Sequence, residues 1–376
     1  MQKKKVLFFI YQMGAGGAAR TFLNILNNID RAKFTPILVT LDYNGGYETY
    51  IKDDVKIIKL PTKRLRSAIL PLAKTIRKEK VDIVFSTIPN YNVIAILGTI
   101  LSFSRAKNVV REAAFLGGSL RENIKLRVVG KLYKHADRVV ALSKGVQDNI
   151  INRYKVNPKK ISVIYNPVDV DGIQRLARQD DIRAEDKEIL KRASKIVVTA
   201  GRLVADKDHR TLINAFSKVQ SRINDAHLVI LGEGILEEEL KQLVRKLELE
   251  EYVHFFGFQK NPYAYFQAAD LFVLSSVREG FGHVLAEALS TGTPIVSTDA
   301  RPGASEVLDY GVYGEMCPRS DSVKLADKIC SMLLLSDEEQ RDIVEKGIER
   351  ANHFHVDKIV RQYENMFLHI LEEKHS

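Results

Sequence analysis

The sequence predicts an α/β protein of two doubly wound, Rossmann-like domains that face each other across a cleft. Apolar runs rich in β-branched residues alternate with helical patterns along the 376 residues, which is typical of parallel sheets covered by helices. Many of these runs lack an alternation of apolar and polar residues, as expected for strands buried on both faces. A strand followed by a glycine turn occurs near the start and again at Lys195–Gly201, so we expect two sheets.

Six apolar runs define the strands expected in the first half of the chain. They are Val6–Tyr11, Pro36–Leu41, Val55–Leu60, Ile83–Thr87, Asn108–Arg111 and Arg138–Leu142. A further run, Ile161–Pro167, ends this half. The second series begins at Lys195–Gly201 and continues through His227–Leu231, Val253–Phe256, Leu271–Ser275 and Pro294–Thr298.

Two segments lie outside these series. Residues 169–194 are polar and charged, so we expect a linker and a peripheral helix there. Val356–Glu372 has one apolar stripe at helical spacing, which predicts a C-terminal helix that crosses back to the first domain. The stripe consists of Ile359, Tyr363, Phe367 and Ile370. We therefore expect an N-terminal domain at 1–165, joined by the C-terminal helix (about 356–376), and a C-terminal domain at 166–355.

Charge is distributed unevenly between the two halves. The net charge is +10, but residues 1–165 hold 30 Lys and Arg against 11 Asp and Glu, a net of +19, and the remainder is acidic at −9. The basic residues gather in Lys63–Arg66, Lys74–Lys80 and Arg121–Lys134. In Arg121–Lys134, apolar residues recur at helical spacing among the cations, which predicts a basic amphipathic helix on an anionic membrane surface. A solvated helix face is the alternative.

Composition excludes several classes of protein. The apolar run Val93–Phe103 is far shorter than the roughly 20 residues that span a bilayer, so we expect no membrane crossing. Val6–Tyr11 is too short for a signal peptide, and two cysteines fit a reducing cytoplasm. The basic half lacks a helix-turn-helix, zinc-finger or RNP pattern, so no nucleic-acid partner is expected. The nine histidines form no metal-ligand pattern, so we expect no metal.

The most informative motif is Glu279-Gly-Phe-Gly-His-Val-Leu-Ala-Glu287. Gly280 and Gly282 disfavour a helix, whereas His283–Ser290 reads as a short helix closed by Gly292. Glu279 therefore lies on the turn before the helix and Glu287 about one turn inside it. The glycines let main-chain N–H groups approach a ligand, and the helix N-terminus favours anions or hydroxyls. Helix capping is the alternative for the two acids.

A second motif, Gly201-Arg-Leu-Val-Ala-Asp-Lys207, leaves the end of another strand. The forked guanidinium of Arg202 and the flexible ammonium of Lys207 suit a diphosphate. Surface ion pairs with Asp206 or Asp208 are the alternative.

Three further glycine turns follow strands. Gly14–Arg20 opens an amphipathic helix at a place where N–H groups favour an anion, although it is not the G-x-G-x-x-G fingerprint. Leu231–Gly234 and Phe256–Phe258 are positioned to make main-chain contacts to a base. Ordinary tight turns are the alternative for all three.

Together, Gly14–Arg20, Gly201-Arg202…Lys207, Gly232-Glu-Gly234 and Glu279-x7-Glu287 with Gly292-x-Pro294 resemble the retaining glycosyltransferases of the GT-B architecture, specifically family 4. The resemblance covers essentially the whole chain. It implies sugar transfer with retention from a nucleotide sugar, which we expect to be a UDP-sugar, without a metal or other cofactor. The acceptor would be a lipid-linked or polysaccharide glycan, at the cytoplasmic face of the cell membrane.

The resemblance also implies roles for single residues. Arg202 and Lys207 would hold the donor diphosphate, and Glu287 would bond the nucleotide ribose. Glu279 would face the transferred sugar. The other donor-binding residues expected are Gly16, Gly17, Gly232, Phe258, Gly280, Phe281, Gly282 and His283.

One segment departs from the family. Many relatives carry a histidine after the strand that corresponds to Asn108–Val110, whereas this chain reads Arg111-Glu-Ala-Ala-Phe115. Arg111 or Glu112 takes that place, so acceptor-side catalysis does not carry over. Asn90, with Ser86 and Thr87, is a further acceptor-side candidate, and ordinary turn polarity is its alternative.

Two other functions stay open at this point. A sugar-nucleotide epimerase of similar shape would convert a UDP-N-acetylhexosamine without any acceptor. A non-catalytic binding subunit would keep the fold without the chemistry, although the presence of Arg202, Lys207, Glu279 and Glu287 argues against it.

Overall fold

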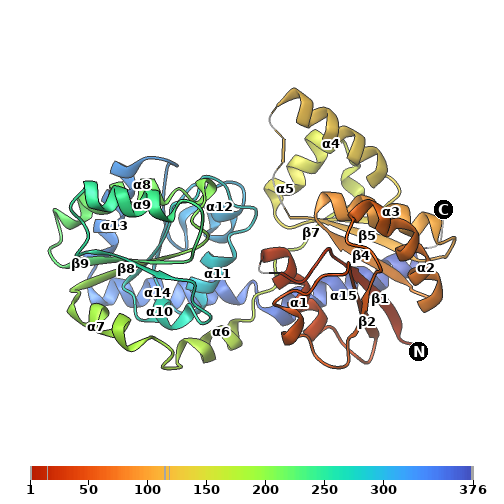
Figure 1. Cartoon of the computed structure of the whole chain (residues 1–376), viewed down its shortest axis with the longest axis horizontal. Helices are drawn as coiled ribbons and strands as arrows, with labels where there is room; N and C mark the ends of the chain where they lie inside the picture. The colour runs from red at the N-terminus through yellow and green to blue at the C-terminus, as the bar shows by residue number, and fades with distance from the viewer. Residues whose placement is uncertain (1, 15, 114–115, 118, 374–376) are drawn as a thin grey trace. The chain divides into compact units, whose positions relative to one another are not determined.

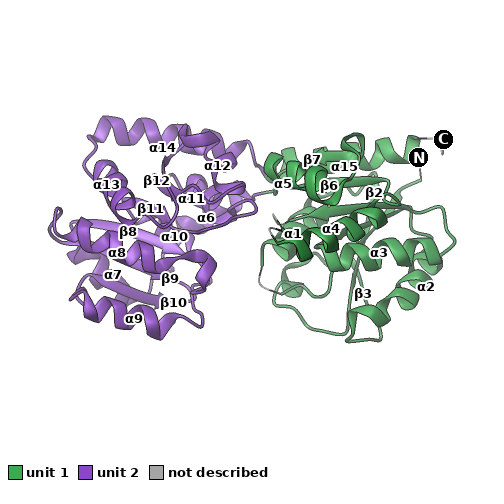
Figure 2. Ribbon diagram, turned by 90° about the horizontal axis from the view of Figure 1, so that it is seen from above, with its two compact units in different colours: residues 1–167, 356–376 green, residues 168–355 purple. Residues whose placement is uncertain are grey.

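The chain folds into two compact units (Figures 1 and 2). The structure is a computed structural model that describes residues 2–14, 16–113, 116, 117 and 119–373. Unit 1 consists of residues 1–167 and 356–376, and unit 2 of residues 168–355. Ala15 of the first glycine turn, Ala114 and Phe115 of the departing segment, and residues 374–376 of the expected C-terminus lie outside the described residues.

Unit 1 contains a seven-stranded parallel sheet in the order β3-β2-β1-β4-β5-β6-β7. The strands are β1 (Lys4–Phe9), β2 (Phe34–Thr40), β3 (Lys56–Lys59), β4 (Ile83–Thr87), β5 (Lys107–Glu112), β6 (Arg138–Ala141) and β7 (Ile161–Val163). The order reverses between β1 and β4, as in doubly wound sheets. The predicted α/β class and the expected strands of this half are confirmed, with ends that differ by no more than two residues.

Helices cover both faces of this sheet. Side chains alternate along β1: Phe8 packs with helices α1 (Gly17–Asn28) and α15 (Val356–Glu372), whereas Phe9 packs with α2 (Ile69–Glu79) and α3 (Pro89–Leu101) on the other face. The remaining helices of unit 1 are α4 (Leu120–Tyr133), α5 (Lys144–Asn149) and the short turns η1 (Glu48–Tyr50), η2 (Leu65–Ala68), η3 (Ile150–Tyr154) and η4 (Pro158–Lys160).

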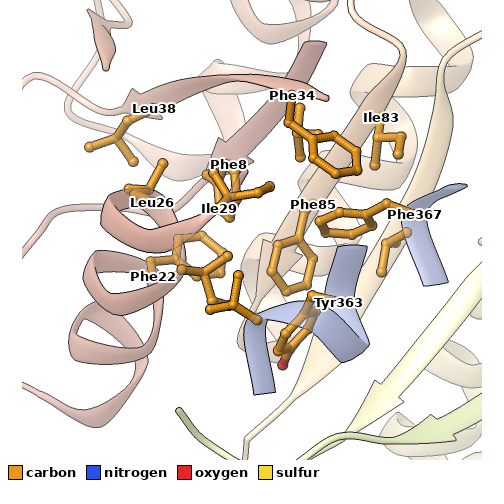
Figure 3. Close-up of a cluster of buried hydrophobic side chains, with 14 of the residues drawn as sticks. Phe8, Phe22, Leu26, Ile29, Phe34, Leu38, Ile83, Phe85, Tyr363 and Phe367 are labelled. Atoms are coloured by element: carbon orange, nitrogen blue, oxygen red, sulfur yellow. The ribbon is translucent and has the colours of Figure 1, made fainter. Parts of the chain in front are cut away.

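The C-terminal helix belongs to unit 1, as its apolar stripe predicted. Figure 3 shows Tyr363 and Phe367 of α15 against Phe85 of β4, and the rings of Phe85 and Phe367 lie 5.6 Å apart in an edge-to-face arrangement. Ile359 and Ile370 are buried in the same core. The last segment of the chain therefore completes the core that the first segment begins.

Unit 2 contains a six-stranded parallel sheet in the order β10-β9-β8-β11-β12-β13. Its strands are β8 (Lys195–Ala200), β9 (Ala226–Leu231), β10 (Val253–Gly257), β11 (Leu271–Leu274), β12 (Ile295–Thr298) and β13 (Glu315–Cys317). The sequence predicted all of these except β13. Its helices are α6 (Val170–Ala177), α7 (Ala184–Arg192), α8 (His209–Gln220), α9 (Glu237–Lys246), α10 (Tyr263–Gln267), α11 (His283–Ser290), α12 (Gly303–Val307), α13 (Ser322–Leu333), α14 (Asp337–Asn352), and the turns η5 (Ala205–Lys207) and η6 (Asp309–Gly311).

The segment at 169–194 is more regular than expected. It forms two helices, α6 and α7, and not a linker with one helix. Asn261 Nδ2 donates a hydrogen bond to the carbonyl oxygen of Leu176 at 2.8 Å, which ties α6 to the body of unit 2. Within the described parts of the chain, no helix is both long enough and apolar enough to cross a membrane.

Candidate active site

Three glycine turns lie side by side at the carboxyl edge of the unit 2 sheet. Gly201, after β8, donates its N–H to the carbonyl of Leu231 at 2.9 Å, and Gly232, after β9, donates to Gly257 at 2.8 Å. Gly232 has φ +130°, and a Cβ there would lie 2.0 Å from the carbonyl oxygen of Gly201. Only glycine fits this close approach. The edge therefore presents main chain at the place where doubly wound sheets bind ligands.

Lys207 and Glu279 form an ion pair at this edge. Lys207 ends η5, Glu279 lies between β11 and α11, and Lys207 Nζ is 2.5 Å from Glu279 Oε1. The two side chains are 22% and 13% exposed, so a ligand can reach both. Two motifs that are 72 positions apart in the sequence thus meet in one site.

The pairing differs from the surface alternative considered for Lys207. Asp206 lies 3.6 Å from Arg278, and Asp208 caps α8 by accepting hydrogen bonds from the main-chain N–H and the hydroxyl of Thr211. The ammonium of Lys207 therefore goes to the predicted site residue Glu279. Arg202, one residue beyond Gly201, is exposed at the same edge.

The loop from Glu279 to His283 is fixed through its main chain. Gly303 N–H donates to the carbonyl oxygen of Glu279 at 2.9 Å, and a Cβ on Gly303 would lie 2.4 Å from the main chain of Phe281. The ring of Phe281 is buried 5.1 Å from that of Phe354, edge to face. The side chain of Phe281 therefore anchors the loop, so its expected donor contact can come only from its main chain.

Helix α11 begins at His283 and ends at Ser290, as predicted. Its N-cap, Gly282, has φ +85°, and no described side chain caps the first turn. A helix start of this kind attracts anions and hydroxyl oxygens. Glu287 lies one turn inside the helix and is buried.

Phe258 lies just beyond β10 and is exposed. Its main-chain N–H is 3.4 Å from Glu233 Oε1, so the turns after β9 and β10 are in contact. Gly232 and Phe258, both expected to contact the base, therefore lie on neighbouring turns.

Sequence reasoning missed the residues that hold the ion pair. Ser276 Oγ donates to Glu279 Oε1 at 2.8 Å, and Ser275 Oγ donates to the main-chain oxygen of Lys207, also at 2.8 Å. Thr298 of β12 donates to the main-chain oxygen of Ser276 at 2.7 Å. The available signal was a pair of serines directly after a buried strand, which reads equally well as an ordinary turn.

In unit 1 the expected donor residues Gly16 and Gly17 stand at the start of α1 and are exposed. Its first turn has no acidic residue, and no described side chain caps it. This leaves an electropositive helix start, the kind of site that the sequence predicted for a phosphate. Asn90, in the first turn of α3, is exposed as well.

Arg111 is buried, in contrast to Arg202. Its guanidinium donates to Thr87 Oγ1 at 3.0 Å and to Asn166 Oδ1. Thr21 in the second turn of α1 donates to the same Asn166 oxygen at 3.3 Å. Arg111 therefore ties β4, β5, α1 and the segment after β7 together. An acceptor-side role for it stays a prediction, and the structure shows no exposed surface on its side chain through which to make that contact.

Glu112 is fully buried on the opposite face of β5. Its carboxyl group accepts hydrogen bonds from Asn92 Nδ2 at 3.1 Å, from the hydroxyl of Tyr154 at 3.3 Å and from that of Tyr133. Burial raises its pKa to about 7, although these donors act in the opposite direction. Glu112 thus joins α3, α4 and η3 beneath the surface, and its acceptor-side role also stays a prediction.

No metal site accompanies these residues in the described ranges. No cluster of three or more His, Cys, Asp or Glu side chains is placed to hold an ion there. Positive groups at the unit 2 edge include Arg202 and Lys207, with Arg278 beside Asp206 and Arg319 bonded to the main-chain oxygen of Val277.

Two family models match consecutive parts of the chain. Residues 15–171 match the model described as Glycosyltransferase Family 4, and residues 181–350 match that of Glycosyl transferases group 1. The first match falls almost wholly in unit 1 and the second in unit 2. The site residues at the unit 2 edge, from Gly201 to Glu287, all lie inside the second match.

Full-length relatives support the same assignment. The chain is 29% identical over 376 residues to the N-acetylgalactosamine-N,N'-diacetylbacillosaminyl-diphospho-undecaprenol 4-alpha-N-acetylgalactosaminyltransferase of Campylobacter jejuni, with 95% of this chain and 98% of that protein covered. It resembles a glycosyltransferase structure from Rickettsia africae at a TM-score of 0.81 and 20% identity, with both chains fully covered. It also resembles Anabaena HepE in complex with UDP and glucose, at a TM-score of 0.81 and 22% identity, with 97% of this chain and 100% of that one covered. At these identities the solved structures establish the fold. The two family models and these relatives show that this chain belongs to the group 1 glycosyltransferases of family 4, which have the GT-B fold.

Proposed function

We propose that this enzyme transfers a sugar from a UDP-sugar, with retention of configuration, to a hydroxyl group of a lipid-linked or polysaccharide acceptor in surface glycan synthesis. The observation that carries the proposal is the Lys207–Glu279 pair beside the glycine turns of β8 and β9. A cation and a carboxylate at one sheet edge match a donor with a diphosphate next to a sugar. HepE, whose fold this chain shares, holds UDP and glucose.

In this proposal the donor lies along the carboxyl edge of unit 2. Arg202 and Lys207 bind its diphosphate, and Glu287 bonds the ribose. Glu279 and the main-chain N–H groups of Gly280–His283 contact the transferred sugar. Gly232 and Phe258 contact the base, and the Gly16–Gly17 helix start of unit 1 binds donor phosphate.

The reaction breaks the bond between the anomeric carbon and the diphosphate oxygen. Arg202 and Lys207 stabilise the negative charge that develops on the leaving diphosphate. A leaving phosphate oxygen takes the proton of the acceptor hydroxyl, whose oxygen bonds the anomeric carbon on the face that the diphosphate leaves. The products are the glycosylated acceptor and UDP, so no additional reactant is needed.

We also propose that unit 1 binds an anionic membrane through α4, which would keep the enzyme at the inner face of the cell membrane. Leu120, Ile124 and Val128 are 79%, 54% and 56% exposed and recur every four residues, so they share one helix face. Exposed Arg121 and Lys125 flank them. The opposite face, with Leu126, Gly130 and Tyr133, is buried against unit 1. An exposed apolar stripe between cations is the chemistry of an interfacial helix. The acceptor of the Campylobacter jejuni relative, by its name, is a diphospho-undecaprenol.

The transferase proposal is tested by a panel of nucleotide sugars with a lipid extract as acceptor. UDP release that requires both the donor and the extract supports it. Proton NMR of a UDP-N-acetylhexosamine incubated alone tests the alternative epimerase, which would produce the epimer without an acceptor. Calorimetry that detects no binding of UDP would instead support a non-catalytic subunit.

Co-sedimentation with vesicles tests the membrane proposal separately. Binding to phosphatidylglycerol vesicles should exceed binding to phosphatidylcholine and weaken with added salt. Ile124→Glu should abolish most of it, whereas Ile235→Glu, at an even more exposed apolar residue of unit 2, should not. Vesicle binding that does not change with salt concentration would contradict docking through α4. An equal loss of binding in both variants would contradict it as well. If the protein forms a dimer that Ile124→Glu abolishes, the apolar face of α4 would instead bind a second copy of the protein.

A further inference from the structure

Two serines directly follow β11, and each holds one member of the ion pair. Successive side chains of an extended segment point to opposite faces. Ser275 Oγ donates to the main-chain oxygen of Lys207, and Ser276 Oγ donates to Glu279 Oε1, each at 2.8 Å. The main chain of Lys207 and the carboxylate of Glu279 are thus both held by residues at one strand end.

The hydroxyl of Ser276 is itself well fixed. Ser276 is fully buried, and Thr298 Oγ1 of the neighbouring strand donates to its main-chain oxygen at 2.7 Å. Glu279, which accepts the hydrogen bond from Ser276, is fixed too, because Gly303 N–H donates to its main-chain oxygen. Neither anchor includes Lys207.

Both hydrogen bonds to the Glu279 side chain end on Oε1. Lys207 Nζ and Ser276 Oγ reach this one oxygen, which leaves Oε2 without a partner among the described residues. The ammonium of Lys207 is a flexible point charge that an arriving diphosphate attracts. Once Lys207 moves toward phosphate, the carboxylate keeps only its bond to Ser276.

We propose that Ser276 is a positioning residue that holds Oε1 of Glu279 while Lys207 turns to the donor diphosphate, so that Oε2 faces the transferred sugar. This inference rests on the proposed function. Ser276 touches neither the donor nor the acceptor in this arrangement, and it acts through Glu279. The bond is made to a charged acceptor, the class of hydrogen bond that contributes most.

Steady-state kinetics of Ser276→Ala, Ser276→Cys and Ser276→Thr test the role. Ser276→Ala should lower kcat about tenfold or more, with the KM for the donor changed less than about threefold, because the bond is to a carboxylate and the diphosphate contacts remain. Ser276→Cys keeps the side-chain volume but is a weak donor, so it should lose kcat as well. Ser276→Thr keeps the hydroxyl and should recover most of kcat. The dissociation constant for UDP, measured by calorimetry, should be unchanged in all three.

A matched control and a double variant separate positioning from folding. Ser290→Ala removes another buried serine hydroxyl of unit 2, bonded only within α11, and should leave kcat unchanged. In a Glu279→Gln background, Ser276→Ala should add less than about a twofold loss, because coupled residues are not additive. An equal loss in both backgrounds, or no recovery with threonine in a folded protein, would overturn the inference. If Glu279→Gln turns over normally, the proposed site fails; if it is inactive while Ser276→Ala and Ser276→Cys are normal, only this inference fails.

Discussion

The carboxyl edges of the two sheets use charged residues in opposite ways. Both sheets start from the same doubly wound strand order, and both place an arginine and a glutamate at or beyond strand ends. In unit 2, Lys207 ends the turn η5, Glu279 lies in the loop before α11, and both remain partly exposed. In unit 1, Arg111 and Glu112 lie within β5 and are buried. The strand-end charges of unit 2 are therefore open to solvent, whereas those of unit 1 are enclosed by protein.

The free-energy cost of burying a charged group explains why the two sheet edges differ. A buried charge must find hydrogen-bond partners inside the protein, and Glu112 takes three donors from three elements. The Lys207–Glu279 pair needs no comparable set of protein hydrogen bonds, because water reaches both side chains. It can open when a ligand offers better partners.

The largest effect expected concerns the accessible edge. Glu279→Gln and Lys207→Ala should each lower the rate of UDP release, in the presence of donor and acceptor, by about 100-fold to 1,000-fold, the usual cost of removing one group that stabilises a transition state. Their melting temperatures should stay within a few degrees of the parent, since the pair is partly exposed. Arg278→Ala, which removes the neighbouring surface pair with Asp206, should keep full activity. Normal turnover in either Glu279→Gln or Lys207→Ala would show that the accessible pair of unit 2 has no role in the reaction.

Two glycines sharpen the comparison between the edges. Gly232→Ala forces a Cβ to 2.0 Å from a carbonyl oxygen at φ +130°, so it should destabilise unit 2 by about 3 kcal/mol or more. Gly16→Ala meets no atom within 4 Å and has an extended backbone, so the melting curve should not change. Calorimetric melting distinguishes them. A loss of kcat/KM in a fully stable Gly16→Ala would support ligand contact at that glycine, and a destabilised Gly16→Ala would contradict this account.

The sequence predicted the fold well because buried parallel strands leave long apolar runs. Helix α11 was placed correctly since glycines bracket it on both sides. Strand β13 was missed because it has three residues, Glu315–Cys317, and starts with a charge. The polar segment after residue 168 forms two helices where one was expected, and α6 buries only one narrow face.

Burial of the β5 residues could not be read from the sequence. Arg111-Glu112 ends an apolar run just as a solvent-facing pair would, and the partners of Glu112 come from Asn92, Tyr133 and Tyr154, which are far apart in the chain. Lys207 and Glu279 are likewise far apart in the sequence, and only the folded unit brings them together. Single motifs identify the chemistry, whereas the partner of each charge depends on contacts distant in sequence.

Glu112 offers a pH test of the buried edge. Burial raises its folded-state pKa to about 7 from an ordinary 4.5, so between these values the folded state binds the proton more tightly than the unfolded state. Stability from this group is therefore greatest below about pH 4.5 and declines as pH rises to 7, by about 3 kcal/mol in total. Glu112→Gln stays neutral, and Tyr154 can then accept a bond from the new amide. The variant should gain stability over the parent as pH rises from 5 to 8.

Urea unfolding of both proteins at each pH measures this difference. Groups that titrate in the same way in both proteins, such as the histidines, do not contribute to the difference in the free energy of unfolding. The charged and titratable groups around Glu112 are Arg111, Tyr133 and Tyr154, and Glu112→Gln changes none of them chemically. A difference that is flat with pH would show that Glu112 stays charged in the folded protein.

The smallest effect expected compares the two arginines directly. Lysine keeps the charge of arginine but loses the fork that bonds two oxygens at once. Arg202→Lys, at the exposed edge, should raise the KM for the donor about tenfold and leave the melting temperature unchanged, because one of two phosphate contacts is lost. Arg111→Lys cannot reach both Thr87 and Asn166, so it should lower the free energy of unfolding by about 1–3 kcal/mol and leave the donor KM unchanged. Kinetics and urea unfolding of the same two variants decide the matter. If the two effects were exchanged, the phosphate contact would belong to the buried arginine, and accessibility would no longer separate the two edges.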